Sequence, residues 1–117
     1  MKTTRFTKRV RLLNAAQFDA AFKRGKRVHS GSFIAVLAPS ELGYPRLGFA
    51  LSKRNAPLSV HRNRLRRLFR EHFRLHQDEL APVDMVLMLK SRAPTEPAEM
   101  VVEVNAVWQK VFERCQS

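Results

Sequence analysis

Cysteine and long apolar runs are both scarce in this sequence, and each shortage restricts what the chain is. Cys115 is the single cysteine among 117 residues, so no internal disulfide forms, which agrees with a reducing compartment. No apolar run approaches the roughly 20 residues that cross a bilayer. The N-terminus is positively charged, but its apolar run is too short for a signal peptide. We therefore expect a cytoplasmic protein with no membrane-spanning segment.

Residues arranged for catalysis are scarce as well. The chain has no glycine-rich phosphate loop, no cluster of cysteine and histidine, and no paired carboxylates. His72 and His76 are four residues apart, but HFRLH lacks the glutamate of a zinc-protease helix and a third ligand. A nuclease acid–base set of His61, Glu71 and His72 is disfavoured, because both histidines project near an apolar helix face. The sequence predicts a binding surface with no catalytic residue and no metal site.

Acidic residues are few, and basic residues are concentrated in two segments. The chain has 22 lysines and arginines against 10 acidic residues, a net charge of +12. Residues 1–30 and 46–74 each hold nine basic residues and one acidic residue, whereas residues 75–117 hold four basic and seven acidic residues. Such blocks attract a polyanion, for which RNA, DNA and an anionic membrane are the candidates.

The pattern along the chain predicts one small domain. A hydrophobic content of 44% supports a packed core, and there is no internal repeat, low-complexity segment or long linker. We expect residues 1–117 to form a single domain that binds a polyanion, in which residues 1–12 are a basic, flexible N-terminal segment.

Periodicity and turn residues predict three helices and at least three strands. The helices are expected from Asn14 to Gly25, from Pro57 and Ser59 to about His76, and from Thr95 onward, with Trp108 on the inner face. The strands are expected at 32–39, 45–52 and 84–90, the second antiparallel to the first and the third buried on both faces. This order predicts an α+β sandwich with helices packed on a sheet.

The helix from residue 57 to 76 carries the strongest functional signal. Between Val60 and His76 there are six arginines and one acidic residue. An ordinary solvated face mixes glutamate with lysine, whereas like charges here repel one another. Arginine suits bidentate contacts with phosphate oxygens, so we favour nucleic-acid contact over a solvated face. Helical spacing places Leu58, Leu65, Leu68, Phe69 and Phe73 inside, Asn63, Arg66, Arg67, Arg70 and Arg74 opposite them, and Arg62 and Arg64 at the shoulders.

Two aromatic residues of the first helix allow two interpretations. Phe18 and Phe22 are four residues apart and precede four basic residues between positions 23 and 27. Aromatics at this spacing are more often core residues than a platform for a ligand. Aromatics among basic residues also form stacking grooves for single-stranded nucleic acid. Both interpretations stay open at this point, and one side chain can pack in the core and also stack on a base.

Taken together, these segments resemble a known family. RNRLRR (62–67) inside a long basic helix resembles the arginine–asparagine–arginine signature of the ribonuclease P protein component, with Arg66 where that family has lysine. Similar segments stand in the same order: RLLNAAQFDAAFKRG (11–25), PRLGFALSKRN (45–55), HRNRLRRLFREHFR (61–74), DMVLMLK (84–90) and a final helix with Trp108. The resemblance covers nearly the whole chain.

The resemblance implies a fold and a function. The fold is a two-layer α+β sandwich with a mostly antiparallel four-stranded sheet, three helices and a left-handed β-α-β crossover, similar to ribosomal protein S5 domain 2. Sequence rules alone favour the opposite hand. The implied function is that of the accessory subunit of ribonuclease P, a ribonucleoprotein endoribonuclease. Its catalytic RNA, with bound Mg²⁺, removes the 5′ leader of precursor transfer RNA, while the protein raises substrate affinity and screens repulsion between the two RNAs.

The resemblance also assigns residues to two RNA contacts. The catalytic RNA is expected to contact Arg62, Asn63, Arg64, Arg66, Arg67 and Arg70. A cleft between the first helix and the sheet is expected to hold the single-stranded leader, at or near Phe18, Phe22, Phe33, Lys53 and Arg54. The implied partners are the catalytic RNA and precursor transfer RNA, with no membrane partner, no cofactor held by the protein and no protein partner required.

Two other functions compete with this one. A non-enzymatic protein that binds ribosomal RNA, in the ribosome or its assembly, has a similar basic α+β frame. A self-sufficient nuclease is the third candidate. Cleavage of precursor transfer RNA by the purified protein alone identifies a nuclease, and the RNA that co-purifies from cells distinguishes the first two.

Overall fold

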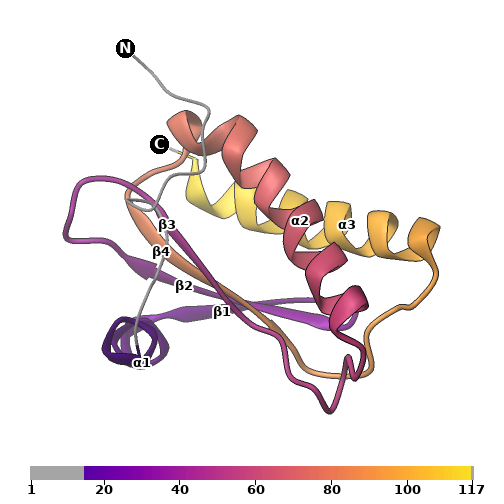
Figure 1. Cartoon of the computed structure of the whole chain (residues 1–117). Helices are drawn as coiled ribbons and strands as arrows, with labels where there is room; N and C mark the ends of the chain where they lie inside the picture. Colours follow the sequence, from indigo (N-terminus) through magenta and orange to yellow (C-terminus); the bar gives the residue numbers. More distant parts are fainter. Residues whose placement is uncertain (1–14, 117) are drawn as a thin grey trace.

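Four strands form the sheet, and helices lie on both of its faces (Figure 1). The computed structural model describes residues 15–116, so the predicted flexible segment 1–12 and the predicted cap Asn14 lie outside the described residues. The elements follow in the order α1 (Ala15–Arg24), β1 (Lys26–Ser30), β2 (Phe33–Pro39), β3 (Arg46–Ala50), α2 (Ser59–His76), a 3-10 turn η2 (Gln77–Glu79), β4 (Val83–Leu89) and α3 (Pro97–Cys115). The predicted α+β class, with three helices on a four-stranded sheet, is confirmed.

The strand order is β1-β2-β4-β3. β1 pairs with β2 and β2 with β4, both antiparallel, whereas β3 pairs with β4 in parallel. The strands predicted at 32–39 and 45–52 run in opposite directions, as expected, but they do not pair, because β4 lies between them. β1 was not among the predicted strands. No described helix is long and apolar enough to cross a membrane.

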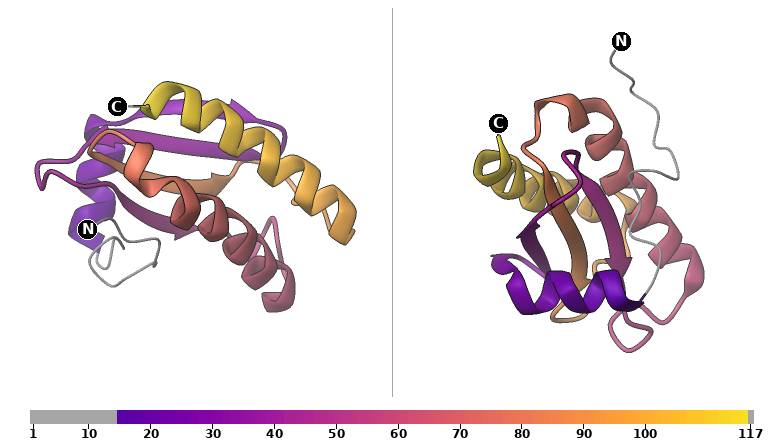
Figure 2. Two further views of the ribbon diagram at one scale, coloured as in Figure 1. Left: turned by 90° about the horizontal axis from the view of Figure 1, so that it is seen from above. Right: turned by 90° about the vertical axis from the view of Figure 1, so that its left-hand side faces the viewer.

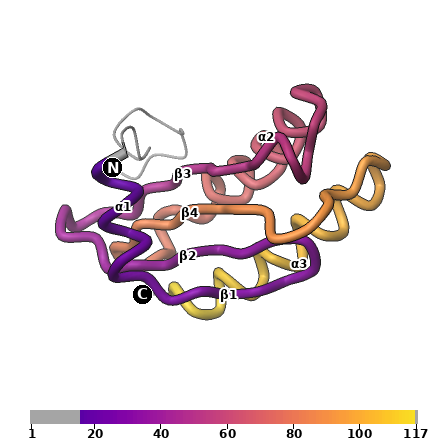
Figure 3. The backbone as a smooth tube through the Cα atoms, turned by 90° about the horizontal axis from the view of Figure 1, so that it is seen from below, coloured from indigo at the N-terminus to yellow at the C-terminus, as the bar shows by residue number. Residues whose placement is uncertain are grey.

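The parallel pair β3 and β4 is connected through α2. Viewed from the side of α2 with the strands pointing upward, β4 lies to the left of β3 (Figures 2 and 3). The crossover is therefore left-handed, as the family resemblance implied. Nearly all β-α-β connections have the other hand, so this topology is distinctive.

The larger core lies between the sheet and the layer formed by α2 and α3. Leu65, Phe69 and Phe73 of α2 are fully buried there. The Phe69 ring meets Phe49 and Trp108 edge-on, with ring centroids 6.2 and 5.4 Å apart. The prediction that Leu58 faces inward is wrong, since its side chain is 56% exposed. Leu58 precedes the first helical residue, so the helical period does not govern its direction.

A smaller core lies on the opposite face, under α1. Ala21 of α1 packs there against Val36 and Ala38 of β2 and Val86 of β4. Gly25 ends the helix where a Cβ would collide with the Ala21 carbonyl oxygen and a Val36 methyl group. Because the backbone approaches β2 so closely at Gly25, the chain passes directly from α1 into β1, and the helix is held across one end of the sheet. The rest of that face is not covered by a described helix (Figure 2).

Candidate nucleic-acid interface

α2 is fixed on three sides, and its fourth side carries arginines. Below the helix lies the larger core. Along one flank, His72 stacks on Trp108 with 5.6 Å between ring centroids, and its Nε2 lies 2.7 Å from Asn105 Oδ1 of α3. Along the other flank, the Arg70 guanidinium lies 5.9 Å from the ring centroid of Phe49 in β3. The helix is therefore a rigid support for the side chains that point outward.

Some of these arginines are engaged within the protein. Arg62 Nη1 donates hydrogen bonds to the carbonyl oxygens of Ala56, at 2.7 Å, and Pro57, at 3.0 Å. Arg66 Nη1 donates to Asn63 Oδ1 at 2.8 Å. Arg62, expected at a shoulder of the helix, therefore also has a structural role, because its guanidinium holds the loop in front of α2.

Arg74 is paired with Glu71 one turn earlier. Its Nε donates to Glu71 Oε2 at 3.1 Å, and this hydrogen-bonded guanidinium holds the pKa of the Glu71 carboxyl below its usual range. Arg64 and Arg67, in contrast, are exposed and form no side-chain hydrogen bond or ion pair within residues 15–116. These two guanidinium groups are the most available phosphate ligands on the helix.

A row of residues crosses the sheet on the face that α1 covers only in part. The register places His29 opposite Ile34, Ile34 opposite Met88, and Met88 opposite Ala50, from β1 to β3. Ile34 and Met88 are half-buried, while His29 and Ala50 are exposed. Lys90 follows β4, and its Nζ lies 3.5 Å from His29 Nδ1. We call His29, Ile34, Ala50, Met88 and Lys90 the open sheet face.

Phe18 and Phe22 border this surface. Their ring centroids are 6.2 Å apart, and both side chains are half-buried against the same small core as Ile34 and Met88. The core interpretation of the aromatic pair is confirmed in part, and the stacking interpretation stays a prediction. The rings stabilise the attachment of α1, and they also expose surface next to the open sheet face.

The prediction that Phe33 lines this surface is wrong. Phe33 is 0% exposed and belongs to the larger core on the other side of the sheet. Successive side chains of a strand point to opposite faces, so Ile34 takes its place. Lys53 and Arg54 are exposed in the turn after β3, at the end of the sheet remote from α1 (Figure 3).

Several residues of the open sheet face were missed by sequence reasoning. Ile34, Met88, His29 and Lys90 carry no motif of their own. Strand alternation counted from a buried Phe33 identifies Ile34. His29 requires the pairing of β1 with β2, and Met88 and Lys90 require the pairing of β4 with β2, neither of which the sequence gives.

An acidic side chain on the α1 side of the sheet is neutralised by an arginine. Arg46 of β3 donates to both carboxylate oxygens of Asp84 in β4, each at 2.8 Å. The side chains are only 12% and 11% exposed, and the hydrogen-bonded carboxylate raises the pKa of Arg46. The pair therefore adds little net charge to this side, where the basic residues dominate.

Histidine and carboxylate side chains do not gather at a metal-binding cluster within residues 15–116. His72 contacts Asn105, and His76 Nδ1 lies 2.8 Å from Glu79 Oε2. The arrangement of the described residues is one of binding surfaces: an arginine-bearing helix and a partly apolar sheet face with aromatic and basic borders.

Comparisons with known proteins agree with this arrangement. A family model described as Ribonuclease P matches residues 6–112. The ribonuclease P protein component of Chromohalobacter salexigens is 34% identical over 108 residues, covering 91% of this chain and 84% of the relative. The one of Azotobacter vinelandii is 39% identical over 108 residues, covering 91% and 83%. A structure of the Staphylococcus aureus RNase P protein matches with a TM-score of 0.76 at 23% identity, covering 87% of this chain and 94% of that one.

Proposed function

This chain belongs to the ribonuclease P protein family, and we propose that it contacts two RNAs on two different surfaces. As a member of the family it is a protein subunit of a ribonucleoprotein endoribonuclease that processes transfer RNA. The competing function in the ribosome is not favoured, since the relatives and the structural neighbours are ribonuclease P proteins.

The first surface is the arginine face of α2, which we assign to the catalytic RNA. Arg64 and Arg67 contribute most, because they are exposed and have no partner within the described residues. Asn63, Arg66 and Arg70 extend the same surface, and Arg62 adds the part of its guanidinium that the loop carbonyls leave available. Because α2 is fixed by its core and by α3, little ordering entropy opposes these phosphate contacts.

The second surface is the open sheet face, which we assign to the single-stranded 5′ leader of precursor transfer RNA. Four strands at their usual spacing make this row about 14 Å wide. Phe18 and Phe22 offer ring surface for bases at one border, and Lys90 is available to phosphates. Lys53 and Arg54 extend the positive charge at the far end of the sheet.

The cleavage chemistry belongs to the RNA in this proposal. Mg²⁺ held by the catalytic RNA would supply a Lewis acid for the hydrolysis, and no residue of this chain would take part in that chemistry. The described residues of this chain form no carboxylate or histidine cluster that fits the ion. The protein, working in the cytoplasm, reduces the repulsion between two polyanions and adds affinity for the leader.

The observation that carries the proposal is the half-covered sheet face beside two half-exposed aromatic rings. The assignment of the leader to the open sheet face is tested by cross-linking in the assembled enzyme. Cysteine is placed at Ala50 of the open sheet face or at Ala106, an exposed alanine of α3 in the opposite layer, after Cys115 is replaced by alanine. A photoreactive label at position 50 should cross-link to leader nucleotides, and the same label at position 106 should not. Equal leader cross-linking from both positions contradicts the proposal.

A further inference from the structure

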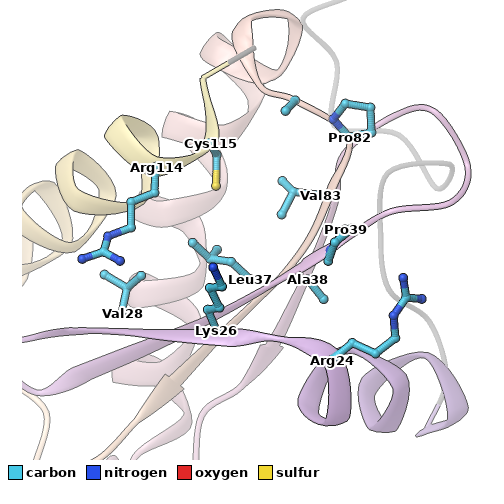
Figure 4. Close-up of a pocket in the computed structure, with 11 residues that line it drawn as sticks. Arg24, Lys26, Val28, Leu37, Ala38, Pro39, Pro82, Val83, Arg114 and Cys115 are labelled. Atoms are coloured by element: carbon cyan, nitrogen blue, oxygen red, sulfur yellow. The ribbon is translucent and has the colours of Figure 1, made fainter.

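A pocket of about 550 Å³ opens between the end of α1 and the C-terminal end of α3, above β1 and β2 (Figure 4). Its floor is apolar and brings together four elements that are far apart in the sequence. Val28 of β1, Leu37 of β2, Val83 of β4 and Cys115 of α3 contribute to it. The volume lies in the usual range of small-molecule sites, about 300–1,000 Å³. The pocket shares no residue with the open sheet face or with the arginine face of α2.

The charged side chains that line the pocket are all basic: Arg24, Lys26 and Arg114. Lys26 and Arg114 lie at one side of the floor and Arg24 at the other (Figure 4). Within residues 15–116, the side chains of Lys26 and Arg114 form no hydrogen bond or ion pair. Arg24 donates to Glu41 at 3.0 Å in a solvent-exposed ion pair. The positive charge of Lys26 and Arg114 is therefore available to an occupant.

The sulfur of Cys115 points into the space between these basic residues (Figure 4). Burial raises the pKa of this thiol to about 11, although nearby Arg114 acts in the opposite direction. The thiol is therefore neutral at physiological pH. It adds no negative charge to the pocket and belongs to the apolar floor.

An occupant that complements this pocket combines an apolar, ring-like body with an anionic group. Guanidinium and ammonium groups both bind phosphate oxygens, and one of each, as in Arg114 and Lys26, suits a group that offers several oxygens. The aliphatic side chains of Val28, Leu37 and Val83 offer a dry surface for a planar ring. A nucleotide has both parts, whereas inorganic phosphate lacks the ring and a nucleoside lacks the charge.

We propose that this pocket binds a nucleoside monophosphate, with its base against Val28, Leu37 and Val83 and its phosphate between Lys26 and Arg114. Such a unit is available from two sources, a free nucleotide or an unpaired nucleotide within an RNA. The pocket does not depend on the assignment of the leader to the open sheet face, because the two surfaces have no residue in common.

The test is a titration of the full-length protein with adenosine 5′-monophosphate, followed by the backbone amide signals of Leu37 and Val83. The variants are Arg114→Gln and its control Lys110→Gln, which removes the same charge one turn away on α3 but outside the pocket. Loss of a charge-assisted contact in Arg114→Gln should weaken the affinity at least about tenfold. The affinity of Lys110→Gln for the nucleotide should stay within about twofold of the parent value, because only the long-range effect of one surface charge is lost. Lys26→Gln should repeat the result of Arg114→Gln.

Separate titrations with adenosine and with inorganic phosphate should each bind more weakly than the nucleotide. The proposal is overturned if both α3 variants lose affinity equally, if phosphate alone binds as tightly, or if the pocket amides do not shift. Assembly with the catalytic RNA then identifies the source. A larger loss in Arg114→Gln than in Lys110→Gln assigns the pocket to a nucleotide of that RNA. If the two variants assemble with the catalytic RNA equally well, and only Arg114→Gln loses affinity for the nucleotide, the pocket is assigned to a free nucleotide.

Discussion

The two faces of the one sheet differ in how completely they are covered. On the side of α2 and α3, Phe33 and Met85 are 0% exposed, as is Phe69 from the helix above them. On the other side, α1 covers only one end of the sheet (Figure 1). In the row from His29 to Ala50, the two outer residues are exposed and the two inner ones are half-buried. Both faces come from the same four strands by alternation of side chains.

This difference separates stability from binding. Apolar area buried on the closed face stabilises the fold by roughly 25 cal/mol for each Å² removed from water. Apolar area left on the open face contributes little to folding and is available to a ligand. Substitutions on the closed face should therefore change the free energy of unfolding, and substitutions on the open face should change RNA affinity.

The strongest contrast is expected between Phe69 and Met88. Phe69→Ala leaves a cavity among Phe49, Trp108 and the rest of the larger core and should lower the free energy of unfolding by about 3–5 kcal/mol. Met88→Ala removes a half-buried side chain and should cost less than about 1.5 kcal/mol. Urea denaturation of both variants measures the difference. Equal losses would mean that the open sheet face is part of the core.

The ion pair under α1 gives the next largest effect. Asp84→Asn removes the charge from a nearly buried, bidentate pair and should lower the free energy of unfolding by about 2–3 kcal/mol. Glu41→Gln breaks the exposed pair with Arg24 and should cost less than about 0.5 kcal/mol. Thermal and urea unfolding compare the two. If Asp84→Asn left the free energy of unfolding unchanged, water would be shown to solvate Arg46 well without its partner.

The arginines of α2 allow stability and RNA binding to be separated within one helix. Arg62→Ala removes two hydrogen bonds to loop carbonyls and should cost about 1–2 kcal/mol of stability. Arg64→Ala should change stability by less than about 0.5 kcal/mol, yet weaken binding of the catalytic RNA and reduce the salt slope of binding by about one unit. Melting curves and salt titrations of both variants provide the check. A salt slope that does not change in Arg64→Ala contradicts the phosphate contact.

The smallest effect concerns pH and the buried thiol on the closed face. The pKa of Cys115 is raised by burial from 9.0 to about 11, so its neutral form is favoured in the folded state. As pH rises above 9, the unfolded chain loses this proton first, and the contribution to stability decreases until the folded thiol ionises near pH 11. Cys115→Ala should therefore lose less stability than the parent chain between pH 8.5 and 10.5. Parallel pH profiles of unfolding free energy test this, and identical profiles contradict it.

The sequence predicts helices well here and strand pairing less well. The boundaries of α2, Ser59 to His76, follow from a turn, a proline and a strict apolar period. β1 escapes detection because KRVHS is an edge strand that has one buried apolar residue, Val28. The position of β4 between β2 and β3 depends on contacts distant in the chain, which local patterns do not record.

The sequence predicted the position of a site residue correctly where the side chain has a single role, and less well where it has two. Arg64 and Arg67 are exposed, as an arginine-rich helix suggests. The structural role of Arg62 was not predicted, because the carbonyl groups it binds belong to a loop whose path the sequence does not give. Phe33 was assigned to the cleft through the resemblance. The run of apolar residues around it shows no strand alternation that could have corrected this, and one step in register moves a side chain to the other side of the sheet.

The central claim, that the open sheet face holds the leader, is tested most directly with Phe22→Ala in the assembled enzyme. Affinities are measured for precursor transfer RNA and for mature transfer RNA, which has no leader. Loss of one stacked base should weaken precursor binding by about 1–3 kcal/mol and leave mature transfer RNA unchanged. Phe112→Ala, a half-buried phenylalanine of α3 stacked near Trp108, serves as the control and should not discriminate between the two RNAs. Equal weakening of both RNAs by Phe22→Ala would contradict the account.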